Sequence, residues 1–169
     1  MSDRLEELIN PLSLATKGRD IEGRIALAKL ARLTPSLRST EGEAEASLHF
    51  GVDEGGMPNV IGRVRATLVL QCQRCMQNMT YEVDTRIRLG IVTSRKAAEN
   101  LPDYFDPLLV SGEEIKVADI VEDELILALP IVAVHEKTEC PVADKFQGQA
   151  EAEPKRENPF AVLAELKKK

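Results

Sequence analysis

Alternating apolar and polar positions dominate the first two thirds of the chain. Apolar and polar residues largely alternate in the three stretches Ala44–Val52, Val60–Leu70 and Tyr81–Ile91. A period of two places successive side chains on opposite faces of a β-strand. The run Asp53-Glu54-Gly55-Gly56 supplies turn residues between the first two stretches. The pattern therefore predicts an antiparallel β-sheet meander with one apolar and one polar face.

The period then changes to that of a helix. Apolar residues recur at helical spacing through Val117–Leu129, and Pro130 ends the pattern. The prediction is a helix packed on the apolar face of the sheet, which makes the fold class α+β, with the helices on one face.

On a helical wheel of this segment, Glu124 falls inside the apolar sector. Asp119, Glu122 and Asp123 fall outside it, and Ile126 falls on the polar side. A charged group inside an apolar face is costly unless it is paired. Either Glu124 meets an arginine from the sheet, or the helix is rotated so that Glu124 lies at the rim of the contact.

Several shorter elements carry weaker signals. Asn10-Pro11 and Gly18 are typical of the start and end of a short helix. The stretch after Gly18 favours a first strand at Ile21–Leu27, with a helical turn at Ala26–Leu33 as the alternative. The remaining predictions are a short helix from Ser94 through Asn100, an edge strand at Leu108–Val110 and a last strand at Pro130–Val134.

The C-terminal part of the chain differs in composition from the rest. Residues 1–142 are expected to form a single α+β domain, and the polar, charged stretch 143–157 a flexible acidic linker. Residues 158–169 carry their own helix start at Asn158-Pro159 and end in three lysines. This C-terminal docking helix would present Phe160, Leu163 and Leu166 on one edge, either to its own domain or to a partner.

Composition narrows the class of protein. Hydrophobic residues make up 43% of the chain but aromatic residues only 4%, so the core must be aliphatic. The apolar runs are too short for a membrane helix, and the acidic start of the chain is unlike a signal peptide. We therefore expect a cytoplasmic protein without a membrane partner. The net charge of −6 argues against broad nucleic-acid binding, although a local basic patch or a basic protein partner remains compatible with it.

The three cysteines suggest a metal site. Cys72 and Cys75 form a Cys-x-x-Cys pair in the predicted turn between two strands, and His135 and Cys140 lie far downstream. Two thiolates from one turn supply half of a tetrahedral zinc site, which His135 and Cys140 would complete. The alternative is a set of reduced structural cysteines. A thioredoxin-type pair is disfavoured because such a pair follows a βαβ pattern.

A basic stripe is the second candidate site. Arg63 and Arg65 lie on the polar face of one predicted strand, and Arg86 and Arg88 on that of the next, beside Arg74. Such a stripe can hold phosphates. The alternative is ordinary cross-strand salt bridging with Glu82 and Asp84, which share that face.

Four segments together carry a family resemblance. They are Leu70-Gln71-Cys72-Gln73-Arg74-Cys75, Val121 to Pro130, His135 with Cys140, and Asn158-Pro159-Phe160-Ala161-Val162-Leu163. In combination they resemble the YceD family, the bacterial large ribosomal RNA subunit accumulation proteins. Lys116 departs from the acidic residue expected to open the long helix. The resemblance implies a role in the synthesis, processing or stability of large-subunit ribosomal RNA, and it carries over no catalytic residues.

The residues themselves also give no sign of catalysis. The chain has no phosphate-binding glycine loop, nucleophile elbow or His-Glu-x-x-His motif. We expect a non-catalytic ribosome-biogenesis factor that binds large-subunit ribosomal RNA or a basic ribosomal protein, with no small-molecule substrate. The alternative is a thiol- or zinc-dependent RNA-processing or redox-regulatory protein.

Overall fold

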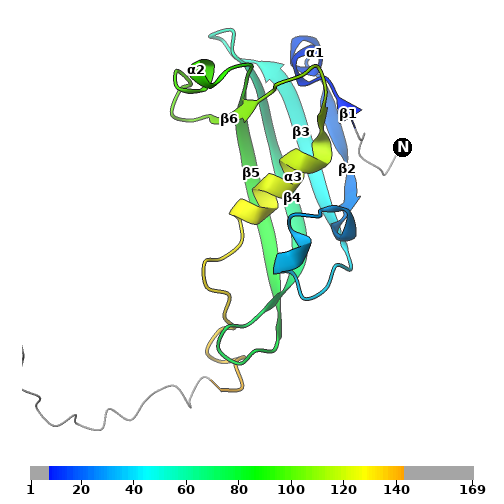
Figure 1. The fold of residues 1–169 in the computed structure, drawn as a ribbon, viewed down its shortest axis with the longest axis vertical. Coiled ribbons are helices and arrows are strands. Elements are labelled where there is room, and N and C mark those ends of the chain that lie inside the picture. The colour runs from blue at the N-terminus through cyan, green and yellow to red at the C-terminus, as the bar shows by residue number, and fades with distance from the viewer. Residues whose placement is uncertain (1–7, 143–169) are drawn as a thin grey trace, which may run out of the picture.

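A computed structural model of the chain describes residues 8–142, and its centre is a five-stranded sheet in the order β2-β3-β4-β5-β6 (Figure 1). The strands are β2 (Asp20–Ala26), β3 (Glu43–Val52), β4 (Pro58–Gln71), β5 (Asn78–Val92) and β6 (Asp106–Leu109). Neighbours from β2 to β5 are antiparallel. β6 runs parallel to β5 at the edge. The predicted α+β fold with an antiparallel meander is confirmed. The edge strand predicted at Leu108–Val110 is present as β6, but it begins two residues earlier, ends one residue earlier and runs parallel to its neighbour.

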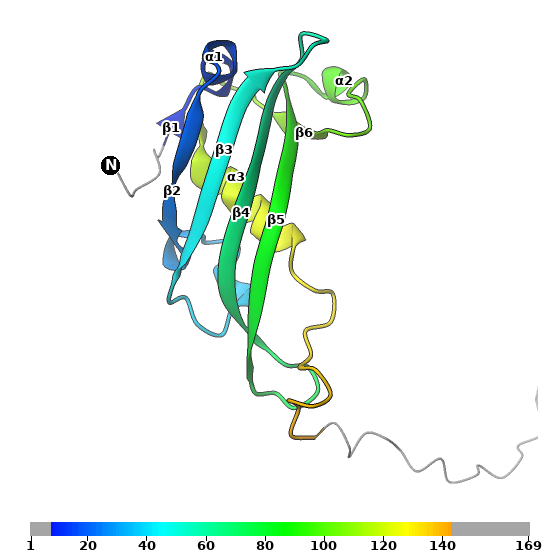
Figure 2. The same cartoon turned by 180° about the vertical axis from the view of Figure 1, so that it is seen from behind.

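The two faces of the sheet follow the alternation in the sequence. Ala44, Ala66 and Val83 are paired across three strands, and all three are buried. The next row along the same strands, Glu45, Arg65 and Asp84, is exposed. Figure 2 shows the polar face toward the viewer, with helix α3 behind the strands. The apolar face therefore forms the core, and the polar face is open.

Short elements flank the sheet at both ends of β2. Helix α1 (Pro11–Lys17) begins where the Asn10 side chain accepts a hydrogen bond from Ser13 N at 2.9 Å, and it ends at Gly18 with φ of 59°. Both cap signals were predicted. After β2 the chain makes two 3-10 turns, η1 (Leu27–Lys29) and η2 (Thr34–Ser36). Both alternatives for this region are thus partly correct, since the strand ends at Ala26 and helical turns follow.

The remaining short elements lie near the top of Figure 1. Helix α2 (Arg95–Ala98) starts at the predicted cap Ser94. Strands β1 (Leu8–Ile9) and β7 (Ile115–Lys116) form a separate two-stranded antiparallel sheet. Two residues are too few to show a period, so the sequence did not predict this pair.

Helix α3 (Val117–Leu127) crosses the apolar face of the sheet. Val117, Val121 and Leu125 are completely buried beneath it. The predicted helix is therefore confirmed, but it ends two residues earlier than expected. Leu129 precedes a proline, and a residue in that position disfavours helical backbone angles. No helix among residues 8–142 is long and apolar enough to cross a membrane.

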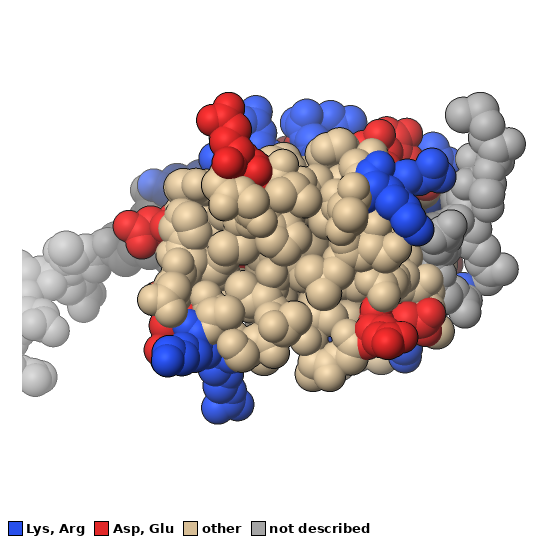
Figure 3. Space-filling view, turned by 90° about the horizontal axis from the view of Figure 1, so that it is seen from above, with Lys and Arg blue, Asp and Glu red and all other residues tan. Residues whose placement is uncertain are grey.

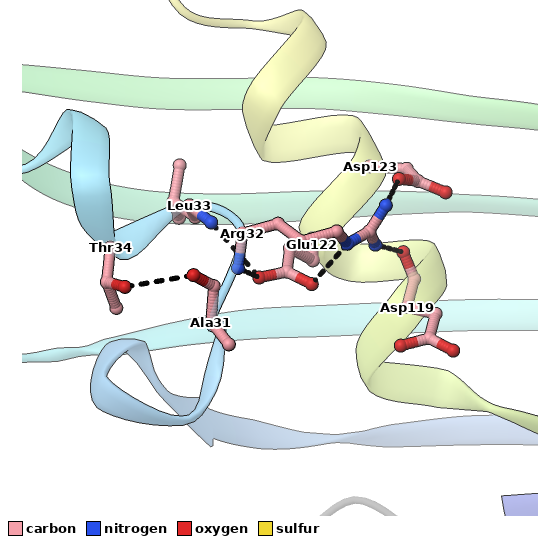
Figure 4. Close-up of polar contacts among 7 residues, drawn as sticks. All are labelled: Ala31, Arg32, Leu33, Thr34, Asp119, Glu122 and Asp123. Carbon is pink, nitrogen blue, oxygen red and sulfur yellow. Dashed lines mark hydrogen bonds and ion pairs between the residues drawn. The ribbon is translucent and has the colours of Figure 1, made fainter.

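The polar side of α3 was wrongly predicted at Glu122. This carboxylate is only 5% exposed. Its Oε1 accepts hydrogen bonds from the backbone N–H groups of Arg32 at 2.6 Å and Leu33 at 3.1 Å, and its Oε2 accepts one from Arg32 Nε at 2.9 Å (Figure 4). The connection between β2 and β3 packs against this flank of the helix. A helical wheel does not include that connection, so it placed Glu122 in solvent.

Two further positions on α3 settle the orientation of the helix. Glu124 is half-buried and has no ion-pair partner within residues 8–142, which corresponds to the rim position rather than to pairing with an arginine. Ile126 was expected on the polar side, but it packs partly buried against the core. The apolar surface beneath α3 is therefore wider than the wheel indicated.

The predicted last strand at Pro130–Val134 is wrong. These residues form a bend and an irregular segment, with Ile131 98% exposed and Val132 also exposed. The backbone O of Ala133 accepts a hydrogen bond from Gln73 N, but no strand lies alongside to form a ladder within the described residues. Apolar composition alone did not make a strand here. The predicted linker 143–157 and C-terminal helix 158–169 lie outside the described residues.

We expect Glu122→Ala to lower the free energy of unfolding by about 2–4 kcal/mol, because it leaves the part-buried N–H of Arg32 and the buried N–H of Leu33 without their acceptor. Asp123→Ala is the matched control. Asp123 binds the guanidinium of Arg32, with Nη1 to Oδ1 at 2.5 Å, but its side chain is 58% exposed, so its loss should cost less than about 1 kcal/mol. Urea denaturation measures both, and equal effects would contradict the structural role of Glu122.

Candidate metal centre

Cys72 and Cys75 lie in the turn between β4 and β5. The turn is closed by two backbone hydrogen bonds, from Cys72 N to Gln77 O at 2.9 Å and from Met76 N to Cys72 O at 2.8 Å. Met76 has φ of 62°, a left-handed conformation that is uncommon for a residue with a side chain. This backbone geometry folds the turn tightly enough for both thiols to reach one point.

The other half of the site comes from the segment after α3. Gln73 N donates to Ala133 O at 2.7 Å, which brings this segment against the turn. The backbone N of His135 then points at the Cys72 sulfur, at 3.5 Å. A turn follows in which Cys140 N donates to Glu136 O at 3.1 Å. Backbone contacts thus place His135 and Cys140 beside the thiol pair.

The structure brings all four predicted ligands together. The sulfurs of Cys72, Cys75 and Cys140 and a ring nitrogen of His135 lie within 4.8 Å of one another. Nδ1 of His135 is 3.3 Å from Cys75 Sγ. Tetrahedral zinc with bonds of about 2.3 Å to sulfur requires sulfur–sulfur separations of about 3.8 Å. The donor atoms are therefore within roughly 1 Å of the spacing that a tetrahedral zinc ion needs.

Cys72 has the electrostatic surroundings of a metal-binding thiolate. It is completely buried, and burial raises the pKa of a thiol. The backbone N–H groups of Cys75, His135 and Arg74 point at its sulfur and outweigh that effect, so the pKa of Cys72 is lowered to about 5. The sulfur is therefore a thiolate at neutral pH, the form in which cysteine binds metals.

Cys75 shows the opposite tendency. Burial raises the pKa of its thiol, and the neighbouring sulfurs of Cys72 and Cys140 raise it further, against a lowering contribution from the amide of Gln77. Crowded sulfurs repel one another when they are charged, and a divalent cation between them removes that repulsion. The donor set therefore fits a zinc ion, which prefers thiolate and imidazole ligands.

The imidazole of His135 is held by its second nitrogen. Nε2 lies 3.1 Å from the backbone O of Asn78. When Nε2 donates its proton to that carbonyl, Nδ1 is left as the free lone pair facing the sulfurs. Ligating histidines are commonly oriented in this way by a carbonyl or carboxylate. Sequence reasoning missed Asn78 because a backbone carbonyl has no residue-specific signal.

Comparison with known proteins bears on the whole chain. Residues 60–167 match the family model described as large ribosomal RNA subunit accumulation protein YceD. The chain belongs to the YceD family. It is similar to the large ribosomal RNA subunit accumulation protein YceD of Haemophilus influenzae, with 33% identity over 170 residues, covering 98% of each chain. No solved structure matches it. The resemblance seen in the sequence is therefore confirmed.

The range matched by the YceD family model contains all four knuckle residues, by which we mean Cys72, Cys75, His135 and Cys140. It also contains Phe160, Leu163 and Leu166, which lie outside the described residues. The family pattern thus covers the knuckle and residues 158–167 of the predicted docking helix.

The structure divides the basic stripe of this YceD-family chain into two parts. Arg63 and Arg65 both bind Asp84, Arg65 through Nε at 3.5 Å. The pKa of Asp84 is lowered, mainly by its hydrogen bonds with the Arg63 guanidinium. This is the cross-strand pairing that the sequence offers as the alternative to phosphate binding. Asp84 thus neutralises part of the charge that this half of the stripe would offer to phosphates.

Arg86 and Arg88 form the free part of the stripe. Both are exposed on the open face of β5, and neither has an ion-pair partner within residues 8–142. Arg74 differs from both, because its Nη1 is buried without a hydrogen-bond partner among the described residues. Figure 3 shows that, at the end of the molecule seen from above, charged side chains lie at the rim around an uncharged centre. That end therefore offers no concentrated charge that competes with the sheet face as a phosphate site.

Purified without chelator, the protein is expected to contain about one zinc per chain, because the four donors complete a tetrahedral set. Cys72→Ser and Cys75→Ser should each lose it. His135→Ala should also lose it, whereas His49→Ala is the matched control, since His49 lies on the open sheet face beside Asp20. Elemental analysis measures the metal. Zinc-free wild-type protein, or full retention in Cys75→Ser, would contradict the site.

Proposed function

We propose that this chain is a non-catalytic, cytoplasmic ribosome-biogenesis factor that supports the synthesis, processing or stability of large-subunit ribosomal RNA. Membership of the YceD family supports the proposal, together with the name of the Haemophilus influenzae relative. The observation that carries the non-catalytic part is the closed donor set of the knuckle. Four protein ligands leave no open coordination position, which is the arrangement of structural zinc sites.

The knuckle residues are also poorly placed for catalysis without a metal. The Cys72 sulfur is completely buried and Cys140 is 6% exposed. His135 has one nitrogen against Cys75 and the other against a backbone carbonyl. Neither nitrogen is free to exchange protons with a substrate, as a general base must. These contacts disfavour the alternative of a thiol- or zinc-dependent RNA-processing enzyme or a redox-regulatory protein.

Zinc in the knuckle would act as a cross-link. Cys75 and His135 are separated by 60 residues in the sequence. A metal held by both segments would fix the tip of the β4–β5 hairpin to the chain that follows α3. In structural sites the binding free energy of the metal contributes directly to folding. The proposed cofactor therefore supplies rigidity, and it sets the point from which residues 143–169 continue.

The open sheet face is the proposed contact surface for ribosomal RNA. Arg86 and Arg88 supply the unpaired cations, with Arg63 and Arg65 beside them across β4. The net charge of −6 limits this contact to a local one. That acidity also favours a basic ribosomal protein as a second candidate partner. The C-terminal segment with Phe160, Leu163 and Leu166 is proposed as a separate docking element.

We expect Arg86→Ala combined with Arg88→Ala to weaken binding to large-subunit ribosomal RNA, because the two guanidiniums no longer neutralise phosphates. In a plot of log affinity against log salt concentration, the slope should fall by about 1.5 when two phosphates are left without a cation. Filter binding with purified protein and transcript measures it. In cells that depend on this chain, the double variant should lower the ratio of large- to small-subunit ribosomal RNA.

The control is Arg24→Ala, which removes a cation of the same face that is already paired with Glu45 at 2.9 Å. It should leave the slope almost unchanged. An unchanged slope in the double variant would refute the contact assigned to Arg86 and Arg88. Binding to a basic ribosomal protein, with no binding to the transcript, would favour the second candidate partner instead.

A further inference from the structure

An apolar groove lies beside α3 on the covered side of the sheet. Its volume is about 350 Å³. Leu89 of β5 and Leu108 of β6 line it together with Ile126 and Leu127 of α3. Figure 1 shows α3 as the one long helix on this face within the described residues. Leu127 is 79% exposed there. The groove therefore lies over the part of the sheet that α3 leaves uncovered. The exposed side chain of Leu127 at its edge can pack against a further apolar group.

The rim of the groove is acidic. Asp106 and Glu124 line it, and neither has an ion-pair partner within residues 8–142. Asp123 also lines it but is paired with Arg32. Burial raises the pKa of Glu124, and the charges of Asp106 and Asp123 raise it further. Two unpaired carboxylates beside apolar side chains favour an occupant that is both apolar and basic.

The C-terminal segment of the same chain has that composition. Phe160, Leu163 and Leu166 recur every three residues, which places them on one edge of a helix. Lys167, Lys168 and Lys169 follow immediately. The apolar edge matches the groove, and the lysines match its acidic rim. A helix of about ten residues is marginal alone in water and needs such a surface.

The connecting chain is long enough. Fifteen residues, 143–157, separate the end of the described part from Asn158, and they span at most about 50 Å when extended. The linker starts near the knuckle, where His135 contacts Asn78 at the beginning of β5. Leu89, which lines the groove, lies eleven residues further along β5. Eleven residues of a strand span about 37 Å, which is less than the extended length of the linker. A tether of this length gives effective concentrations in the millimolar range.

We propose that residues 158–169 dock in cis in the groove formed by α3, β5 and β6. Phe160, Leu163 and Leu166 cover Leu89, Leu108 and Leu127, and the terminal lysines neutralise Asp106 and Glu124. The segment then acts as a second helix on the apolar face of the sheet. A basic apolar segment of another molecule competes for the same groove.

The first test is charge reversal in the full chain. Asp106→Lys with Glu124→Lys should lower the melting temperature by about 2–4 °C, the scale expected for a chain of this size. Deleting residues 158–169 should have the same effect, and the two changes together should not add, because they remove one interaction. Reversing Lys167, Lys168 and Lys169 to glutamate in the charge-reversed chain should restore the melting temperature.

The matched control is Glu43→Lys with Glu82→Lys. These two carboxylates are exposed on the opposite face of the sheet and have no ion-pair partner within residues 8–142. The same change of charge there should leave the effect of the deletion intact. Full additivity of the deletion with the reversal at Asp106 and Glu124 would overturn the proposal.

The second test needs no variant in the groove. Zero-length carbodiimide coupling of the wild-type chain, followed by mass spectrometry, should join the terminal lysines to Asp106 or Glu124 within one chain. Coupling between chains would assign the groove to a second copy and overturn docking in cis. Absence of coupling, with an unchanged melting temperature on deletion, would leave the groove to a separate partner and would also overturn it.

Discussion

The apolar face of the sheet needs a cover, and the placement of that cover depends on the buried carboxylate of Glu122. Three donors from Arg32 and Leu33 meet its two oxygens. Burying a carboxylate without such partners would cost several kcal/mol. The contact therefore fixes the position of α3 on the sheet. The hydrogen-bond donors come from the connection between β2 and β3. That connection is thus joined to helix α3 at this point.

The seating of α3 in turn determines where the chain goes next. The helix ends near the middle of the molecule, and the chain continues toward the tip of the β4–β5 hairpin (Figure 1). That hairpin is longer than the rest of the sheet, with strands of 14 and 15 residues. Pairing of β3 with β4 ends at Ala66, apart from an isolated bridge between Ser39 and Val69. An isolated two-stranded ribbon is marginally stable in water, so the knuckle supplies the contacts that the missing neighbours do not.

The charged side chains are also distributed differently on the two faces of the sheet. On the open face, the side chains of Arg24, Arg63 and Arg65 are paired with carboxylates of neighbouring strands. Arg86 and Arg88 lie on β5 where β6 no longer pairs with it, since that pairing begins at Leu89. The cations that are free for a partner are thus found along the unpaired stretch of an edge strand. On the opposite face the groove beside α3 carries the complementary acidic rim.

The sequence predicted what depends on local periodicity. The strands followed from alternation because each strand buries one face, and the thiol turn followed from the spacing of Cys72 and Cys75. The partners of those thiols were proposed from chemistry and lie where expected. Features that depend on a distant backbone were missed, including the amides that meet Glu122 and the Asn78 carbonyl. The prediction of a strand at Pro130–Val134 was wrong for a related reason. The composition of this segment suits a strand, but no neighbour among the described residues pairs with it.

Zinc binding by the knuckle is tested most directly by X-ray absorption at the zinc edge. The spectrum reports the number, type and distance of the atoms bound to the metal in the full chain as isolated. The expected result is three sulfurs at about 2.3 Å and one nitrogen at about 2.0–2.1 Å, with no oxygen. Fewer sulfurs, or a water in the first coordination sphere, would contradict a closed structural site formed by Cys72, Cys75, His135 and Cys140.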